Sequence, residues 1–218
     1  MSSLIFVTEP EQVLTGTDTL ATSPVGEPAF FTTKAFIVPH LNMIMCGTGM
    51  GGFLGKWFIE VNDRMLVRGI DNLDYHTPER LLDLWLDFKT CNSVPDNLTT
   101  TIYHFGFSEE DRLIHSYAYR SVSKFSSESL TYGMGIKPEC ISTEGLEFPG
   151  DIRKIMDEQR LLQQSRPKDE RIYIGGEIQI HHLTREGFVV YVLDQFEDFE
   201  VIQNAMFDSY LSQEGNTG

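Results

Sequence analysis

The sequence predicts one α+β domain in which strands and helices are segregated into layers. Three observations support this fold class. Apolar segments rich in β-branched and aromatic residues come in groups, helical patterns also come in groups, and the two do not alternate one for one as they do in parallel α/β folds. The 218 residues suit a single domain. We assign residues 1–211 to this domain and expect the polar residues 212–218 to form a disordered tail.

The first half of the chain predicts two hairpins followed by a helix. Residues 4–7 and 13–22 suggest two strands joined by a bend, and residues 30–39 and 41–49 suggest a second hairpin that turns after Pro39. The apolar runs of the second hairpin are nearly continuous, so we expect these strands to be covered on both faces. A glycine-rich stretch then leads into a helical pattern at 53–66.

A second helix is predicted to begin at Thr77 and Pro78. Threonine is a favoured N-cap residue, and proline is favoured at the first helical position because its missing N–H has no partner there. The following residues, 81–88, place apolar side chains on one face. The second half predicts these further elements: strands at 99–107 and within 112–136, a helix at 150–164, a hairpin within 171–196 that turns at 185–187, and a last helix at 199–211.

Composition excludes several classes of partner. With 17 basic and 32 acidic residues the net charge is −15, which argues against nucleic acid or an anionic membrane surface as partner. The three cysteines, Cys46, Cys91 and Cys140, contain no C-x-x-C pair, so we expect reduced thiols in a cytoplasmic protein. We see no signal peptide and no apolar run near the roughly 20 residues that span a bilayer. We expect no cofactor.

The start of the chain suggests a nucleophile. If Met1 is removed, Ser2 carries a hydroxyl and a free α-amine, and an α-amine with a pKa of about 7.7–8.0 can act as a base near neutrality. Asp18 lies sixteen positions after Ser2, and Lys34 lies thirty-two positions after it. A lysine held by a buried aspartate could tune that amine electrostatically.

This order and spacing resemble the proteasome β-subunit family of N-terminal-nucleophile hydrolases. The segment TDTLAT is similar to the family's D-S-R-A-T, and TTKAFIVPHLNMIMCGTG is similar to its lysine strand, turn and glycine-ended strand. Later, IGGEIQIHHLTREGFVVYVL resembles the family's S-G-G strand and its return strand. The resemblance implies a four-layer αββα sandwich. It also implies hydrolysis of peptides or small amides, and self-association, with rings as one form.

The resemblance also implies roles for individual residues. Ser2 would be the nucleophile, with Ser3 as the alternative if trimming proceeds further. Lys34 would assist proton transfer, and Asp18 would hold Lys34. A glycine N–H at the start of the first helix would bind the oxyanion, and Gly47 matches this position best, one residue early in strict count, with Gly49 as second choice.

Three departures from the family pattern favour an alternative function. The family has a second aspartate and a serine just before its paired glycines, where this chain has Arg171 and Ile174. Ile136 stands where another family serine follows a glycine-rich stretch, and Asp169 could replace the aspartate only after a loop shift. The alternative is a catalytically inactive relative that acts as an assembly or partner-binding subunit.

Each feature also has an ordinary structural interpretation. Ser2 could be a tolerated start residue, Asp18 a turn residue and Lys34 a solvating charge on an edge strand. The glycines at 47–52 suit a strand-to-helix turn better than a phosphate loop, since no Gly-Lys-Ser/Thr follows. The acidic run at 109–111 is expected to be a solvated hairpin tip. We expect no metal site, because the candidate histidines are on opposite strand faces or on different strands: His104, His115, His181 and His182.

Overall fold

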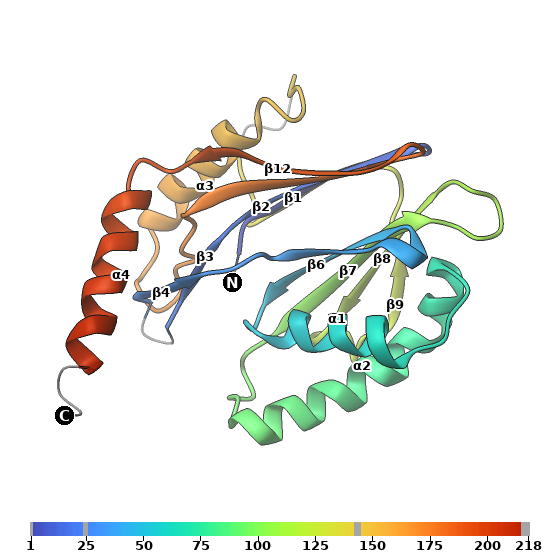
Figure 1. Ribbon diagram of the computed structural model, residues 1–218, viewed down its shortest axis with the longest axis horizontal. Coiled ribbons are helices and arrows are strands. Elements are labelled where there is room, and N and C mark those ends of the chain that lie inside the picture. Colours follow the sequence, from blue (N-terminus) through green and yellow to red (C-terminus); the bar gives the residue numbers. More distant parts are fainter. Residues whose placement is uncertain (1, 24–25, 142–144, 215–218) are drawn as a thin grey trace.

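The computed structural model describes residues 2–23, 26–141 and 145–214. It contains two five-stranded sheets whose paired strands run antiparallel (Figure 1). The first sheet has the order β10-β1-β2-β11-β12 and the second has the order β5-β6-β7-β8-β9. The strands of the first sheet are β1 (Leu4–Glu9), β2 (Gln12–Asp18), β10 (Gly133–Lys137), β11 (Glu177–Thr184) and β12 (Gly187–Gln195). Those of the second sheet are β5 (Ala35–Val38), β6 (Met43–Gly49), β7 (Thr100–Phe107), β8 (Ile114–Arg120) and β9 (Ser127–Ser129).

Helices cover the outer faces of the two sheets. Helices α1 (Phe53–Arg64) and α2 (Ile70–Asn92) lie on the second sheet, and α3 (Ile152–Gln164) lies on the first (Figure 1). Three clusters of buried apolar residues match the three interfaces between these layers: helices with second sheet, sheet with sheet, and first sheet with α3. The layer order is therefore αββα, and the predicted α+β sandwich is confirmed.

The predicted hairpins form with short turns. Glu9 pairs with Gln12 where β1 turns into β2, and Thr184 pairs with Gly187 where β11 turns into β12. Strands β5 and β6 are joined by a 3-10 turn at Pro39–Leu41. The first four residues of β6 are buried, as its continuous apolar run predicts for a strand covered on both faces.

Two predicted strands are each interrupted. The run at 13–22 breaks at Thr19, where β2 ends and the short β3 (Leu20–Thr22) begins. The backbone N–H groups of Thr19 and Leu20 both donate to the carbonyl of Gly175 there, so the chain leaves the ladder of the first sheet. The run at 30–39 divides into β4 (Pro28–Phe31), which pairs with β3, and β5.

The predicted helix start at Thr77 is wrong, because α2 already begins at Ile70 and contains Pro78. Thr77 is buried, and its hydroxyl donates to the carbonyl of Leu73 at 2.8 Å instead of capping the residues that follow. The true start is stabilised from outside the helix, since the carboxylate of Glu109 accepts from the first N–H groups of α2.

The remaining helices agree with the sequence pattern. Helix α1 buries Phe53, Trp57 and Val61 at four-residue spacing, and α3 matches the helix expected at 150–164. The last helix, α4 (Phe199–Glu214), extends three residues past the predicted end at 211. Residues 215–218 of the predicted tail lie outside the described part of the chain.

Candidate active site

Asp18 is the centre of a buried polar cluster at the end of β2. Its side chain is completely buried and accepts three hydrogen bonds. The Ser3 backbone N–H and the Lys34 ammonium donate to Oδ1 at 2.9 and 2.8 Å, and the Gly175 N–H donates to Oδ2 at 3.1 Å. These donors come from the chain start, from the residue before β5 and from the segment before β11, so one carboxylate joins three distant segments.

Lys34 is held between this carboxylate and a carbonyl. Its Nζ donates to Asp18 Oδ1 and, at 2.7 Å, to the Leu20 carbonyl. Burial lowers the pKa of the Lys34 ammonium, and the negative charge of Asp18 opposes that shift without cancelling it. The spacing prediction that Asp18 would hold Lys34 therefore corresponds to a direct ion pair in the structure.

The two N-terminal serines face different surroundings. Ser2 lines a cavity of about 400 Å³, together with Thr48, Gly49 and Lys137. Ser3 is buried, and its hydroxyl donates to Gln159 Oε1 at 2.6 Å. The Ser3 hydroxyl is thus engaged by α3, while Ser2 is positioned where a small molecule or peptide could reach it. Removal of Met1 concerns a residue outside the described part of the chain.

The cavity lies at one end of the space between the two sheets. The second sheet contributes the end of β6 and the start of β7, and the first sheet contributes the end of β10 and the residues after it. The lining residues are Ser2, Thr48, Gly49, Thr99, Thr100, Thr101, Ile136, Lys137, Pro138, Glu139, Arg166 and Ile172.

Of the two glycines considered for the oxyanion, only Gly49 is among the lining residues. Its φ of +103° and the approach of the Thr99 carbonyl, 2.2 Å from where a Cβ would lie, require glycine here. Gly47 lies two residues earlier in β6, opposite Ile102 and beneath the Leu54 side chain of α1. Strand β5 pairs with β6 only as far as Cys46. In the described part of the chain, Gly47 and Gly49 therefore have no pairing residue in β5.

The three departures from the family pattern have different environments. Ile136 lines the cavity, where its side chain offers no hydrogen bond. Ile174 is buried in the core beneath α3. The Arg171 guanidinium is turned toward the end of α3, where it donates to the carbonyls of Gln164 and Arg166 at 2.8 and 2.9 Å. Asp169 is exposed in a turn.

Two residues of this region carry no local sequence signal. Gln159 reaches the chain start from α3, donating to the Pro138 carbonyl while it accepts from Ser3. Lys137 reaches the cavity from the edge strand β10. Each is one polar residue within an ordinary helix or strand pattern, so only the tertiary fold identifies it.

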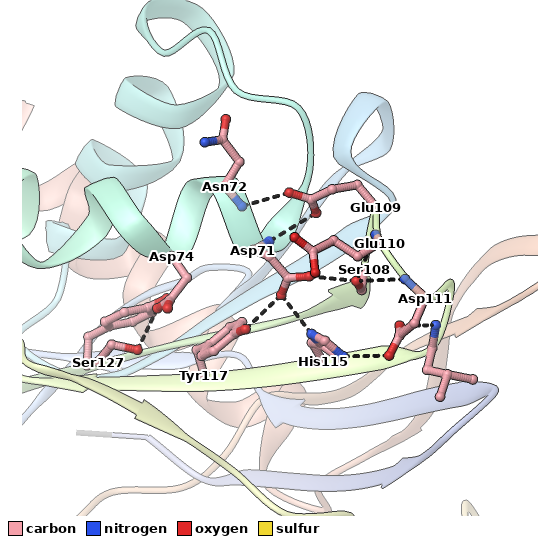
Figure 2. Close-up of polar contacts among 12 residues, drawn as sticks. Asp71, Asn72, Asp74, Ser108, Glu109, Glu110, Asp111, His115, Tyr117 and Ser127 are labelled. Atoms are coloured by element: carbon pink, nitrogen blue, oxygen red, sulfur yellow. Dashed lines mark hydrogen bonds and ion pairs between the residues drawn. The ribbon is translucent and has the colours of Figure 1, made fainter.

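The acidic run at 109–111 is only partly the solvated tip predicted, because Glu110 and Asp111 are exposed but Glu109 is half-buried. Figure 2 shows Glu109 turned toward the start of α2, where it accepts from the N–H groups of Asp71 and Asn72 at 3.1 and 2.7 Å. Asp71 in turn accepts from His115 Nδ1 at 2.7 Å, and Asp111 lies 3.2 Å from the other ring nitrogen. The network ties α2 to the β7–β8 turn. Burial opposes protonation of His115, but the two carboxylates outweigh it and raise the pKa.

The histidines do not form a metal centre within the described residues. No group of three or more potential ligands converges there. His104 is buried, and its Nε2 accepts from Trp57 Nε1 at 2.8 Å. His181 is buried in β11, and its neighbour His182 points to the other face, where its Nε2 lies 2.9 Å from Gln12 Oε1. No helix in the described ranges has the length and apolar character that crossing a membrane would need.

A larger cavity, of about 650 Å³, lies on the outer face of the first sheet beside the 145–149 segment. Its polar lining residues include Glu9, Gln12 and His182. Gln12 joins the other two, donating to Glu9 at 2.6 Å and facing His182 at 2.9 Å. Asp18 and Lys34 line neither of these two cavities, whereas Ser2 lines the smaller one and not the larger. We therefore place the candidate active site in the smaller cavity, with the Asp18–Lys34 pair buried outside its lining.

The αββα layers are those of the proteasome-subunit-like fold of N-terminal-nucleophile hydrolases. Solved structures of Anbu share it along nearly the whole chain. Anbu from Hyphomicrobium sp. strain MC1 is 12% identical at a TM-score of 0.57, with 99% of this chain and 97% of that chain covered. Its Gly-1 mutant is 10% identical at a TM-score of 0.59, with the same coverage. Anbu (ancestral β-subunit) from Yersinia bercovieri is 8% identical at a TM-score of 0.57, with 99% and 96% covered.

At these identities the likeness establishes the fold, so the family resemblance is confirmed at that level. Comparison with family models and with curated proteins gave no match.

Proposed function

We propose that this protein is a proteasome-like N-terminal-nucleophile hydrolase that cleaves amide bonds with Ser2. The observation that carries the proposal is the position of Ser2 in a cavity. The next residue, Ser3, donates its backbone N–H to the Asp18 carboxylate, which is paired with Lys34. Peptides are the expected substrates, with small amides as the other candidates. Cytoplasmic location remains an expectation from the cysteine content.

The proposed mechanism begins with a free Ser2 amine. The Ser2 hydroxyl attacks the substrate carbonyl while its own α-amine accepts the hydroxyl proton. The Lys34 ammonium stabilises the negative charge that develops on the Ser2 oxygen, and Asp18 keeps Lys34 in place. The backbone N–H of Gly47, or of Gly49 as the second choice, is the proposed donor to the oxyanion.

Collapse of the tetrahedral intermediate breaks the C–N bond. The protonated α-amine gives its proton to the leaving nitrogen, and an ester on Ser2 remains. Water then attacks the ester carbonyl, the α-amine accepts the water proton, and the Ser2 oxygen leaves and is reprotonated. Each cycle consumes one water and restores the free hydroxyl and amine.

The experiment that tests this is intact-mass analysis before and after exposure to an electrophile that captures N-terminal hydroxyl nucleophiles. The exposed thiol of Cys91 is replaced by serine so that it does not take up the probe. We expect loss of Met1 and a single adduct on Ser2, absent in Ser2→Ala and slower in Lys34→Ala. The matched control Ser3→Ala should retain the adduct. A retained Met1 would remove the free amine and refute the mechanism.

A second candidate function is supported by the isoleucines at the accessory positions. Ile136 and Ile174 supply no side-chain hydrogen bond to orient the Ser2 amine. If the Ser2 amine is not oriented for catalysis, the protein acts as an inactive assembly or partner-binding subunit. Loss of Met1 without any adduct in the experiment above would favour it.

We also propose that the chain self-associates, with rings as one form, as its fold suggests. Exposed apolar side chains support a second copy as the partner, because contact between copies would remove this apolar surface from water. On α4 they include Val201 and Phe207, which are 71% and 62% exposed, and on β12 they include Val189 and Val190. Sedimentation of the untagged protein would show a single monomeric species if this is wrong.

A further inference from the structure

Lys137 points into the space between the two sheets beside Ser2. It pairs with Leu4 across β10 and β1, and Leu4 belongs to the apolar cluster between the sheets. Residues directly opposite one another in an antiparallel pair share a face, so the Lys137 side chain points to the same interior. Its ammonium lies 5.4 Å from the centre of the Tyr103 ring, and the residue lines the cavity that contains Ser2.

The positive charge of Lys137 is not neutralised by a carboxylate. None of the ion pairs among the described residues includes Lys137, whereas the neighbouring cations are matched. Arg166 pairs with Glu139 at 3.1 Å, and Arg120 pairs with Glu128. In a chain whose net charge is −15, the cavity beside Ser2 thus contains an uncompensated cation.

The surroundings of Lys137 favour the arrival of an anion. Burial is the main cause that lowers the pKa of its ammonium, and the charge of Arg120 lowers it further. A carboxylate placed next to the ammonium would raise this pKa and so counter both effects, because its negative charge stabilises the protonated form of the lysine. The Tyr103 ring face beneath the ammonium holds it in position for such a contact.

We propose that the Ser2 cavity selects substrates that carry a carboxylate, and that Lys137 is the residue that recognises it. The carboxylate would contact the Lys137 ammonium while the scissile carbonyl lies at the Ser2 hydroxyl. This inference rests on the proposed function for its reaction, although the binding preference itself does not require turnover. The carboxylate could belong to an acidic side chain or to a C-terminus, and the test distinguishes these sources.

The test uses peptide electrophiles that share one reactive group and differ in charge. One probe has a glutamate side chain and an amidated C-terminus, one has glutamine in its place, one has lysine, and one is neutral except for a free C-terminal carboxylate. The second-order rate of adduct formation on Ser2 is measured by mass. We expect an anionic probe to react about tenfold faster than the glutamine probe, since tenfold corresponds to one modest charge interaction.

Variants of Lys137 identify the recognising residue. In Lys137→Gln the rate ratio of the anionic to the neutral probe should fall to about one, and in Lys137→Glu the lysine probe should become the fastest. Lys154→Gln removes the same charge from the exposed side of α3 and should keep the wild-type ratio. An unchanged ratio in Lys137→Gln, or an equal loss in Lys154→Gln, would overturn the inference.

A binding measurement separates failure of this inference from failure of the proposed function. Acetylated, non-reactive peptides with glutamate, glutamine or a free C-terminal carboxylate are titrated into the protein by calorimetry. If no probe labels Ser2 but a carboxylate peptide binds about tenfold tighter than the glutamine peptide, the hydrolase proposal fails and the carboxylate site stands. If the carboxylate peptides bind no tighter than the glutamine peptide, the inference about Lys137 is wrong whatever the labelling shows.

Discussion

Removing Asp18 should destabilise the fold more than any other single change at the site. In Asp18→Ala the buried ammonium of Lys34 retains only the Leu20 carbonyl, and the N–H groups of Ser3 and Gly175 lose their acceptor. Breaking a buried ion pair by deleting one partner costs about 3–5 kcal/mol. We therefore expect the free energy of unfolding to fall by about 4 kcal/mol. A domain of this kind has about 5–15 kcal/mol in total, so the variant should still fold.

The companion change, Lys34→Met, should cost less. The Asp18 carboxylate then keeps its two backbone N–H donors, which still stabilise its charge, so we expect a loss of about 2 kcal/mol. The double variant removes both charges together and leaves no ion buried alone. Its cost should be smaller than the sum of the single costs by about 1–3 kcal/mol, the range seen for coupled neighbours.

Urea unfolding at neutral pH, followed by tryptophan fluorescence, measures these free energies, because Trp57 is fully buried and reports loss of the core. Asp87→Ala, an exposed aspartate on α2, is the matched control and should change the free energy of unfolding by no more than about 0.5 kcal/mol. If the Asp18 and Lys34 effects add to within about 0.5 kcal/mol, the two side chains are not coupled and the reasoning is refuted.

Two further predictions concern stability away from the cavity. Burial lowers the pKa of His104 to about 3. Below pH 6.5 the unfolded chain therefore binds a proton that the folded chain does not, and wild type at pH 5 should lose about 2 kcal/mol through this residue. Urea titrations at pH 7 and pH 5 give the free energy of unfolding at each pH. Between these pH values it should fall by about 2 kcal/mol less in His104→Gln than in wild type, and an equal fall in both proteins would contradict the prediction. Glu109→Ala removes the external cap of α2 and should cost about 1–2 kcal/mol, whereas exposed Glu110→Ala should cost almost nothing; equal losses would show that Glu109 is not a cap.

Local patterns predicted the layers of this fold because the relevant signals are short-range. The hairpins follow from apolar runs interrupted by turn residues, and α1 follows from apolar residues at four-residue spacing. The Asp18–Lys34 pair was expected from the resemblance to a known family, not from a local pattern. Asp18 ends β2 in the first sheet and Lys34 precedes β5 in the second, so no hairpin register brings them together, and their contact at 2.8 Å depends on how the two sheets pack.

The start of α2 shows where local reasoning fails. Thr77 and Pro78 form a better local start signal than Gly69 and Ile70, yet the helix begins at the weaker site. The carboxylate that stabilises this start belongs to Glu109, which is 38 residues further along than its first N–H partner. A cap supplied by tertiary structure leaves no trace in the helix's own sequence. Gln159 and Lys137 escaped prediction for the same reason, since α3 and β10 bring them to Ser2 only after folding.

The energetics of the Asp18–Lys34 pair also bear on the choice between an active enzyme and an inactive scaffold. A chain that lost catalysis could not easily lose either partner, because each deletion leaves the other charged and buried. The pair would therefore persist in both cases, and its presence weighs little between them. Ser2 is different, since it lines the cavity and its replacement leaves no buried charge unpaired. Ser2→Ala should accordingly abolish labelling with almost no loss of unfolding free energy, whereas Asp18→Ala should reduce both, and this separation is the signature expected of a nucleophile held by a structural ion pair.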